Sequence, residues 1–139
     1  MQTDNPARAH PQAHAPAHAQ AAICPRFHYA VELIGRRWTG AILRALLDGA
    51  TRFTDITCAV PGLSDRLLSE RLRELESEAI VTRTVIPEMP VRVEYQLTEK
   101  GRALESVMAA IGAWATEWVE LPEDAEACAK HGDSGDCGC

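Results

Sequence analysis

The sequence predicts a mainly α-helical domain with one small β-hairpin. Apolar residues recur every three or four positions, the spacing of an amphipathic helix, along segments 26–34, 38–47, 64–78 and 98–120. Residues 81–97 instead alternate with a period of two, which indicates strands. The predicted order is therefore helices, then a hairpin, then a long last helix.

The early helices are short and end at turn residues. Helical periodicity begins near Arg26 and is interrupted by a glycine before the second helix, 38–47. A glycine also stands just past the end of that second helix, which is a common C-terminal signal. A third helix, 53–59, is followed by Pro61-Gly62, and this dipeptide predicts a tight turn.

The helix over 64–78 has the clearest signals. Ser64 suits its N-cap, because a serine hydroxyl accepts a hydrogen bond from a first-turn amide. The face expected to be buried carries Leu68, Leu72, Leu75 and Ala79. The opposite face carries Arg66, Glu70, Arg73 and Ser77, with Ser69 on its flank. We therefore expect one side of this helix in a core and the other exposed.

After this helix the hydrophobic period changes. Strands are predicted over 81–86 and 91–97, and residues 87–90, with two prolines, form an exposed tip. Thr98 is the expected N-cap of a final helix that extends to about Glu120 and is ended by Pro122. The apolar side of that helix is too large for so small a domain to cover. We therefore predict a homodimer, with Ile111, Trp114 and Trp118 at its interface.

This order of elements predicts a winged helix-turn-helix. A short helix, a tight turn and a capped amphipathic helix form the helix-turn-helix, and the hairpin that follows is the wing. The major groove of DNA is about 12 Å wide and admits one helix. We expect the helix over 64–78 to enter that groove, so that double-stranded DNA is the partner.

Several motifs resemble those of the HxlR-type transcriptional regulators across residues 24–121. They are Cys24-Pro25, Gly35-Arg36-Arg37-Trp38-Thr39, Arg52-Phe53-Thr54-Asp55-Ile56, Leu68-x-x-Arg71-Leu72-Arg73-x-Leu75-Glu76, Pro87-x-x-Pro90 and Val93-Glu94-Tyr95-x-Leu97-Thr98-x-x-Gly101. The resemblance implies a homodimer that binds operator DNA through the helix 64–78 and the wing, about 86–92. Ala79 departs from the family, which usually has Gly there, so the left-handed cap that glycine favours stays open.

The candidate DNA-binding residues are Ser64, Arg66, Ser69, Arg73, Arg52 and Arg92. Arg66 and Arg73 suit guanine edges or phosphates, and the serines supply hydroxyls. Arg52 opens the short third helix and suits a phosphate, whereas Arg92 leaves the wing near the minor groove. We predict a regulator that binds an inverted-repeat operator as a dimer, with repression favoured and activation left open.

Three other charged residues near these positions have alternative interpretations. One of Arg36 and Arg37, which precede Trp38, contacts phosphate or pairs with an acid such as Glu32. Glu70 accepts from cytosine or, in preference, pairs with a neighbouring arginine of its own helix.

Cys24 is the candidate redox sensor. It precedes the first helix, and a helix N-terminus favours thiolate and lowers a thiol pKa. The HxlR-type family includes thiol-based sensors with a cysteine at this position. We expect an oxidant or a small-molecule effector to act there by changing how the protomers pack. Cys58, in the third helix, is expected to be buried and inert.

No cofactor, metal site or enzymatic activity is predicted. Weak candidate metal ligands are Cys128, His131, Cys137 and Cys139, whose types suit zinc or copper but whose spacing matches no standard zinc motif. The chain has no phosphate-binding loop, nucleophile elbow or H-E-x-x-H motif. Two alternatives stay open: a metal- or thiol-sensing regulator that uses these residues, and a winged-helix protein-interaction module that binds no DNA.

Composition sets the domain organisation. The chain has 139 residues and a net charge of -6. Residues 36–73, however, contain seven arginines and only four acidic residues. Basic charge therefore gathers where DNA is expected. We predict a disordered Ala/Pro/His arm over 1–22, the winged domain over 23–122 and an acidic, Cys-containing tail over 123–139. No secretory signal or membrane span is predicted, so we expect a cytoplasmic protein without membrane contact.

Overall fold

The computed structural model describes residues 22–122. The predicted arm, apart from residue 22, and the predicted tail with its four candidate metal ligands lie outside the described residues. The chain divides after Gly35 into two units, which we describe separately. Within 22–122, no helix is both long and apolar enough to cross a lipid bilayer.

The first unit contributes one described helix, α2 (Pro25–Ile34). Pro25 occupies its first position, where the missing amide hydrogen costs nothing because that amide has no partner within the helix. None of its residues is buried, and Phe27 and Val31, one turn apart, are 63% and 50% exposed. This helix therefore leaves an apolar face uncovered within its own unit.

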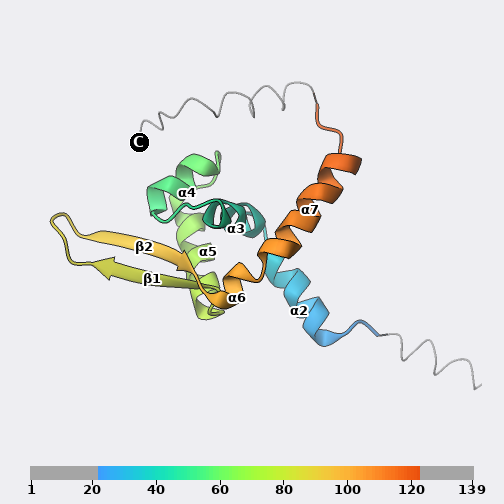
Figure 1. Cartoon of the computed structure of the whole chain (residues 1–139), viewed down its shortest axis with the longest axis horizontal. Coiled ribbons are helices and arrows are strands. Elements are labelled where there is room, and N and C mark those ends of the chain that lie inside the picture. The colour runs from blue at the N-terminus through green and yellow to red at the C-terminus, as the bar shows by residue number, and fades with distance from the viewer. Residues whose placement is uncertain (1–21, 123–139) are drawn as a thin grey trace, which may run out of the picture. The chain divides into compact units, whose positions relative to one another are not determined.

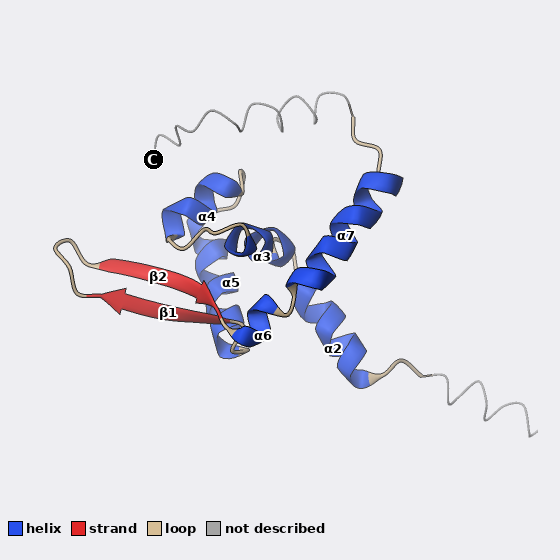
Figure 2. Cartoon of the chain, in the orientation of Figure 1, coloured by secondary structure: helices blue, strands red, loops and turns tan. Residues whose placement is uncertain are grey.

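The described part of the second unit, residues 36–122, is mainly helical with a single hairpin, which confirms the predicted fold class (Figures 1 and 2). Its elements are α3 (Thr39–Leu47), α4 (Phe53–Ala59), α5 (Asp65–Ser77), β1 (Val81–Ile86), β2 (Arg92–Leu97), α6 (Glu99–Arg102) and α7 (Glu105–Trp118). In Figure 2 the hairpin extends as a two-stranded arm away from the helices.

The core of this unit lies among α3, α4, α5 and the base of the hairpin. Its fully buried large side chains are Ile42, Leu43, Ile56, Leu68, Leu72, Leu75, Ile80 and Val81. The leucines of α5 follow the 4, 3 spacing that places them on one face of a helix. The face of α5 predicted to be buried is thereby confirmed, apart from Ala79, which lies past the helix and is exposed.

The hairpin is antiparallel, and its register runs from Val81 opposite Leu97 to Ile86 opposite Arg92. Its base is anchored, because Val81 is buried and the Tyr95 amide donates to the Thr51 carbonyl at 2.7 Å. Farther out, Val85 is 49% exposed. The base of the wing is therefore part of the core, whereas its outer half is exposed.

The prediction of one continuous helix over 98–120 is wrong. Thr98 caps α6, but the chain turns at 103–104, where the Leu104 amide donates to the Gly101 carbonyl at 3.1 Å. That three-residue step differs from the four-residue step of an α-helix. The second part, α7, ends at Trp118 because Val119 is already extended. The α conformation is disfavoured for a residue that precedes proline, so Leu121-Pro122 also prevents the helix from resuming.

The end of α5 forms a left-handed cap even though it lacks glycine. Ala79 has a φ of 58°. The Ile80 amide donates to the Leu75 carbonyl at 2.9 Å, and the Ala79 amide donates to the Glu76 carbonyl at 3.0 Å. These two bonds define a Schellman motif, which normally has glycine at the position of Ala79. Burial of both Leu75 and Ile80 supplies the apolar contact of that motif.

Candidate nucleic-acid interface

The helix α5 has one buried and one exposed face, as a recognition helix requires. Ser64 accepts a hydrogen bond from the Leu67 amide at 3.2 Å and so caps the helix as predicted. Arg66 and Arg73 are exposed, and Ser69 is half-buried. Two arginine side chains therefore extend into solvent from the face opposite the core.

The turn before α5 is set by Gly62. Its φ of +88° lies in the left-handed region that favours glycine. The neighbouring Val60 and Leu63 are buried, which fixes α4 against α5. Arg52, at the N-cap of α4, is exposed, and its amide donates to the Asp55 carboxylate at 3.1 Å. The predicted helix-turn-helix is thus present, with Arg52 at the N-terminus of its first helix, α4.

Arg66 is paired only loosely. Its Nε lies 3.4 Å from the Glu70 carboxylate, and its side chain is 90% exposed. This contact confirms the preferred pairing for Glu70. Exposed pairs of this kind contribute about 0.2–1 kcal/mol, so little energy holds the Arg66 guanidinium away from an anionic ligand.

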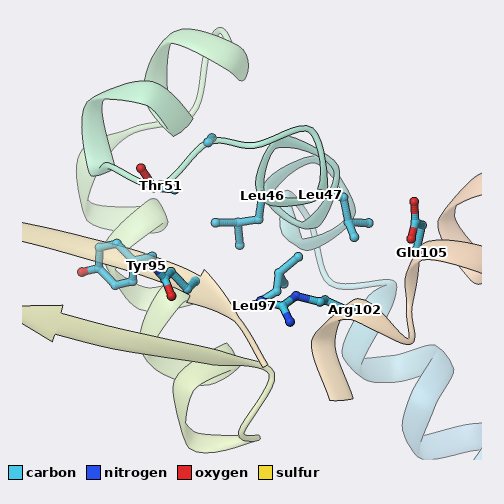
Figure 3. A pocket seen from close by; sticks show the side chains of 9 residues that line it. Leu46, Leu47, Thr51, Tyr95, Leu97, Arg102 and Glu105 are labelled. Carbon is cyan, nitrogen blue, oxygen red and sulfur yellow. The ribbon is translucent and has the colours of Figure 1, made fainter. Parts of the chain in front are cut away.

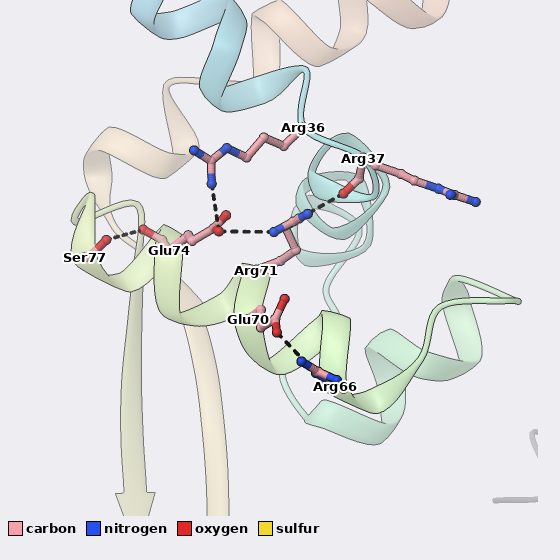
Figure 4. Close-up of polar contacts among 7 residues, drawn as sticks. All are labelled: Arg36, Arg37, Arg66, Glu70, Arg71, Glu74 and Ser77. Carbon is pink, nitrogen blue, oxygen red and sulfur yellow. Dashed lines mark hydrogen bonds and ion pairs between the residues drawn. The ribbon is translucent and has the colours of Figure 1, made fainter.

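A second cluster joins α5 to the segment that precedes α3 (Figure 4). The Arg36 Nη1 and the Arg71 Nη1 both donate to Glu74 Oε1, at 2.8 and 3.1 Å. The Arg71 Nε also donates to the carbonyl of Arg37 at 3.0 Å. The carboxylate partner of Arg36 is therefore Glu74. Sequence reasoning missed Glu74 because it lies 38 residues away.

The candidate on the wing is more enclosed than expected. Arg92 lies between two carboxylates, with Nη2 3.5 Å from Glu88 and Nε 3.1 Å from Glu94. Arg92 Nε and Glu94 form an ion pair, but their alignment is not that of a hydrogen bond. These acids reduce the positive potential that Arg92 presents. Arg83 of β1, which sequence reasoning did not single out, is exposed.

Cys24 is exposed at the N-terminus of α2. No side-chain hydrogen bond of standard geometry caps that helix, but the amides of Phe27 and Arg26 lower the pKa of the Cys24 thiol. Partial positive charge on first-turn amides favours the thiolate. Cys58 is half-buried rather than fully buried. Ile56 is the one residue of α4 that is fully buried.

The second unit also contains a hollow of about 410 Å³ beside α3 (Figure 3). Leu46 and Leu47 line one side of it and Leu97 and Arg102 line another. No residue of α5 lines this hollow, so it is separate from the exposed face of that helix. Among residues 22–122, no group of three or more His, Cys, Asp or Glu residues is placed to hold a metal ion.

A capped helix with a basic outer face, a preceding helix and turn, and a following hairpin define a winged helix-turn-helix DNA-binding protein. The chain belongs to the HxlR-like helix-turn-helix family, whose model matches residues 33–123. It is a DNA-binding transcriptional regulator, as the resemblance implied.

Relatives of known sequence and structure agree with this assignment. An uncharacterized HTH-type regulator of Bacillus subtilis, YvaP, is 52% identical over 101 residues, covering 73% of this chain and 94% of YvaP. The B. subtilis regulator YodB is 48% identical over 98 residues, covering 70% of this chain and 88% of YodB.

Two solved structures are also similar. Reduced YodB from B. subtilis matches with a TM-score of 0.64 and 46% identity, covering 73% of this chain and all of the solved chain. YodB has also been solved in diamide-treated and quinone-bound forms. The redox regulator HypR in its oxidized form matches with a TM-score of 0.65 and 35% identity, covering 70% of this chain and all of the solved chain.

Proposed function

We propose that this regulator binds an inverted-repeat operator as a homodimer and releases it when Cys24 is oxidised or modified by an electrophile. The observation that carries the proposal is the exposed Cys24 thiol, whose pKa is lowered at the start of α2. The relatives support it, since YodB has diamide-treated and quinone-bound forms and HypR is a redox regulator.

The DNA contacts are proposed to come mainly from α5. Arg66 and Arg73 are exposed on it and suit guanine edges or phosphates, with Ser64 and Ser69 beside them. Arg52, at the start of α4, suits a phosphate. We expect Arg92 to contribute less than the sequence predicted, because it reaches DNA only by leaving Glu88 and Glu94.

The dimer is proposed from apolar faces that the described protomer leaves uncovered. On α7, Ile111, Trp114 and Trp118 are 48%, 60% and 67% exposed and repeat at intervals of three and four residues. Such a stripe on one helix face suits an isologous contact, in which the same surface of two copies meets itself. The separate unit with α2 has an uncovered apolar face of its own, which suits the same role.

A disturbance at Cys24 would act through that dimer. Oxidation to a sulfenate, or to a disulfide across the dimer, changes the group at the start of α2. A small rotation between protomers then misaligns the two recognition helices with half-sites spaced about 10 bp apart or a multiple of this. Operator binding depends on both helices engaging at once, so a modest rotation has a large effect on affinity.

The test is operator binding before and after oxidant. A labelled duplex from upstream of the protein's own gene is titrated with reduced and diamide-treated protein, and binding is followed by fluorescence anisotropy. We expect diamide to abolish binding by the wild type and to leave Cys24→Ser bound. Cys58→Ser and a chain truncated after Pro122, which lacks Cys128, Cys137 and Cys139, should both still respond.

A pH series sharpens this test. Because the Cys24 pKa is lowered, its thiolate persists to lower pH than an ordinary thiol, and its alkylation by iodoacetamide should slow only as pH falls through that lowered pKa. An alkylation profile of Cys24 that matches a free cysteine would remove the basis for its sensitivity. A response that survives Cys24→Ser but disappears on truncation would instead place the sensor in the tail.

A further inference from the structure

The two neighbouring arginines before α3 have different surroundings. Arg36 is held by Glu74 at 2.8 Å. Arg37 is exposed, and within residues 22–122 its guanidinium has no carboxylate partner; its one contact is the ring of Trp38, 5.3 Å from Cζ to the ring centroid. The first arginine therefore has a carboxylate partner, which it shares with Arg71, whereas the second presents its charge to solvent without one.

The backbone at Arg37 is fixed to α5. Its carbonyl accepts from the Arg71 Nε at 3.0 Å, and Arg71 is itself held by Glu74 at 3.1 Å. The Arg71 side chain that makes this link is only 16% exposed. Arg37 thus moves with α5, although it lies 34 residues before Arg71 in the sequence.

The side chain of Arg37 extends away from this cluster (Figure 4). The Trp38 ring that supports it packs against the turn between α4 and α5, where a Cβ built on Gly62 would lie 3.6 Å from the tip of the indole. That turn leads directly into Ser64 and Arg66. The Arg37 guanidinium therefore lies over a ring that is itself next to the turn leading into α5.

We propose that Arg37 binds a DNA backbone phosphate at the edge of the groove that α5 enters. An α-helix with its side chains is about 10–12 Å across, which fills a groove about 12 Å wide, so a cation beside the start of the helix lies near the phosphates that border the groove. The cation–π contact with Trp38 restricts the guanidinium in advance and lowers the entropy lost on binding. The inference rests on α5 being the recognition helix.

Phosphate contacts carry no sequence information, so the test needs no knowledge of the operator. The protein is kept in a thiol reductant, so that oxidation of Cys24 does not affect the measurement. It is titrated against two unrelated labelled mixed-sequence duplexes at several salt concentrations. For Arg37→Ala we expect the slope of log affinity against log salt to become shallower by about 0.9 for each bound protomer. Affinity should fall roughly fivefold to tenfold at 0.1 M salt for each bound protomer, on both duplexes.

Matched variants separate a phosphate contact from a general loss of charge. Arg36→Ala and Arg44→Ala each remove one positive charge that is already paired, with Glu74 and Asp48 respectively, and should keep the wild-type slope. Arg37→Lys should also keep it, because a lysine still neutralises a phosphate. Thermal unfolding should show Arg37→Ala to be as stable as the wild type.

Three outcomes would overturn the inference. One is an unchanged slope for Arg37→Ala, and another is an equal decrease for Arg37→Ala and the two control variants. The third is a wild type that fails to bind either duplex, which would also contradict DNA binding itself. A wild type whose DNA binding does not change with diamide would contradict the role of Cys24. It would not contradict the proposed Arg37 contact.

Discussion

At the scale of single residues, the surroundings of a side chain decide what it can do. Arg36 and Arg37 are adjacent in the chain, but only Arg36 has a carboxylate at 2.8 Å. Arg66 and Arg92 were both predicted to contact DNA, yet Arg66 is 90% exposed with one loose pair whereas Arg92 lies between two carboxylates. Residue type alone would treat these four arginines as equivalent.

Ala79 offers a test of backbone strain at this scale. A left-handed conformation costs a residue with a Cβ roughly 1–2 kcal/mol, and Ala79 has a φ of 58°. Ala79→Gly should therefore raise the free energy of unfolding by about 1 kcal/mol, less than the full strain because glycine has more freedom in the unfolded chain. Urea denaturation measures this difference.

The control for Ala79 is an alanine in ordinary geometry. Ala103 has a φ of -63° and is also at the end of a helix, so Ala103→Gly should lower stability by about 0.5–1 kcal/mol. If the two substitutions change stability in the same direction, the left-handed strain at Ala79 is not the cause.

At the scale of elements, α6 lies between the end of α5, the proposed recognition helix, and α7, the proposed dimer helix. Thr98 donates to the Ala79 carbonyl at 2.6 Å and accepts from the Gly101 amide at 3.1 Å. Lys100 donates to the Glu78 carbonyl at 2.7 Å. The short helix is thus bonded directly to the residues that end α5, which explains why it is separate from α7.

Gly101 is the position where this packing allows no side chain. It is buried, and a Cβ there would collide with the Ile80 carbonyl oxygen and lie 3.0 Å from Leu97 Cδ2. Gly101→Ala should lower the free energy of unfolding by about 1–3 kcal/mol through overpacking. Thermal or urea unfolding provides the measurement.

Gly112 supplies the comparison for this substitution. It lies within α7, and nothing stands within 4 Å of its would-be Cβ. Gly112→Ala should stabilise the protein by up to about 1 kcal/mol, since alanine is the better helix former. A Gly101→Ala variant as stable as the wild type would mean that α6 does not pack tightly on Ile80.

At the scale of the whole molecule, the uncovered apolar residues point to assembly. Three large side chains of α7 each stay about half or more exposed in the described protomer, although burial of one large apolar side chain contributes about 1.5–3 kcal/mol. The acidic net charge of -6 does not oppose DNA binding, because seven of the arginines lie within 36–73.

Trp114 tests the proposed dimer. Trp114→Glu places a charge in the apolar stripe of both copies, and we expect it to raise the dimer dissociation constant at least roughly 100-fold. Light scattering should then give a mass near the 15.2 kDa of one chain, against twice that mass for the wild type. Val85→Glu, at a similarly exposed apolar residue on the hairpin, should remain dimeric. A wild type that is monomeric at micromolar concentration would contradict the proposal.

Much of the fold could be predicted because its signals are local. The spacing of Leu68, Leu72 and Leu75 specified the buried face of α5, and Ser64 specified its start. The least accurate prediction, a single helix over 98–120, failed because its interruption depends on the contact between Gly101 and Ile80, which are distant in the sequence. The apolar periodicity on both sides of the interruption gave no sign of it.

The sequence by itself determined the element types, the order of helices and hairpin, the family and the candidate reading face, because periodicity, caps and turn residues act within a few positions. Only the tertiary structure decided which charges are free. Arg36 meets Glu74 across 38 residues, whereas the guanidinium of its neighbour Arg37 has no carboxylate partner within residues 22–122 and lies over the Trp38 ring. The strength of a charge pair depends on distance and solvent exposure, and the fold sets both.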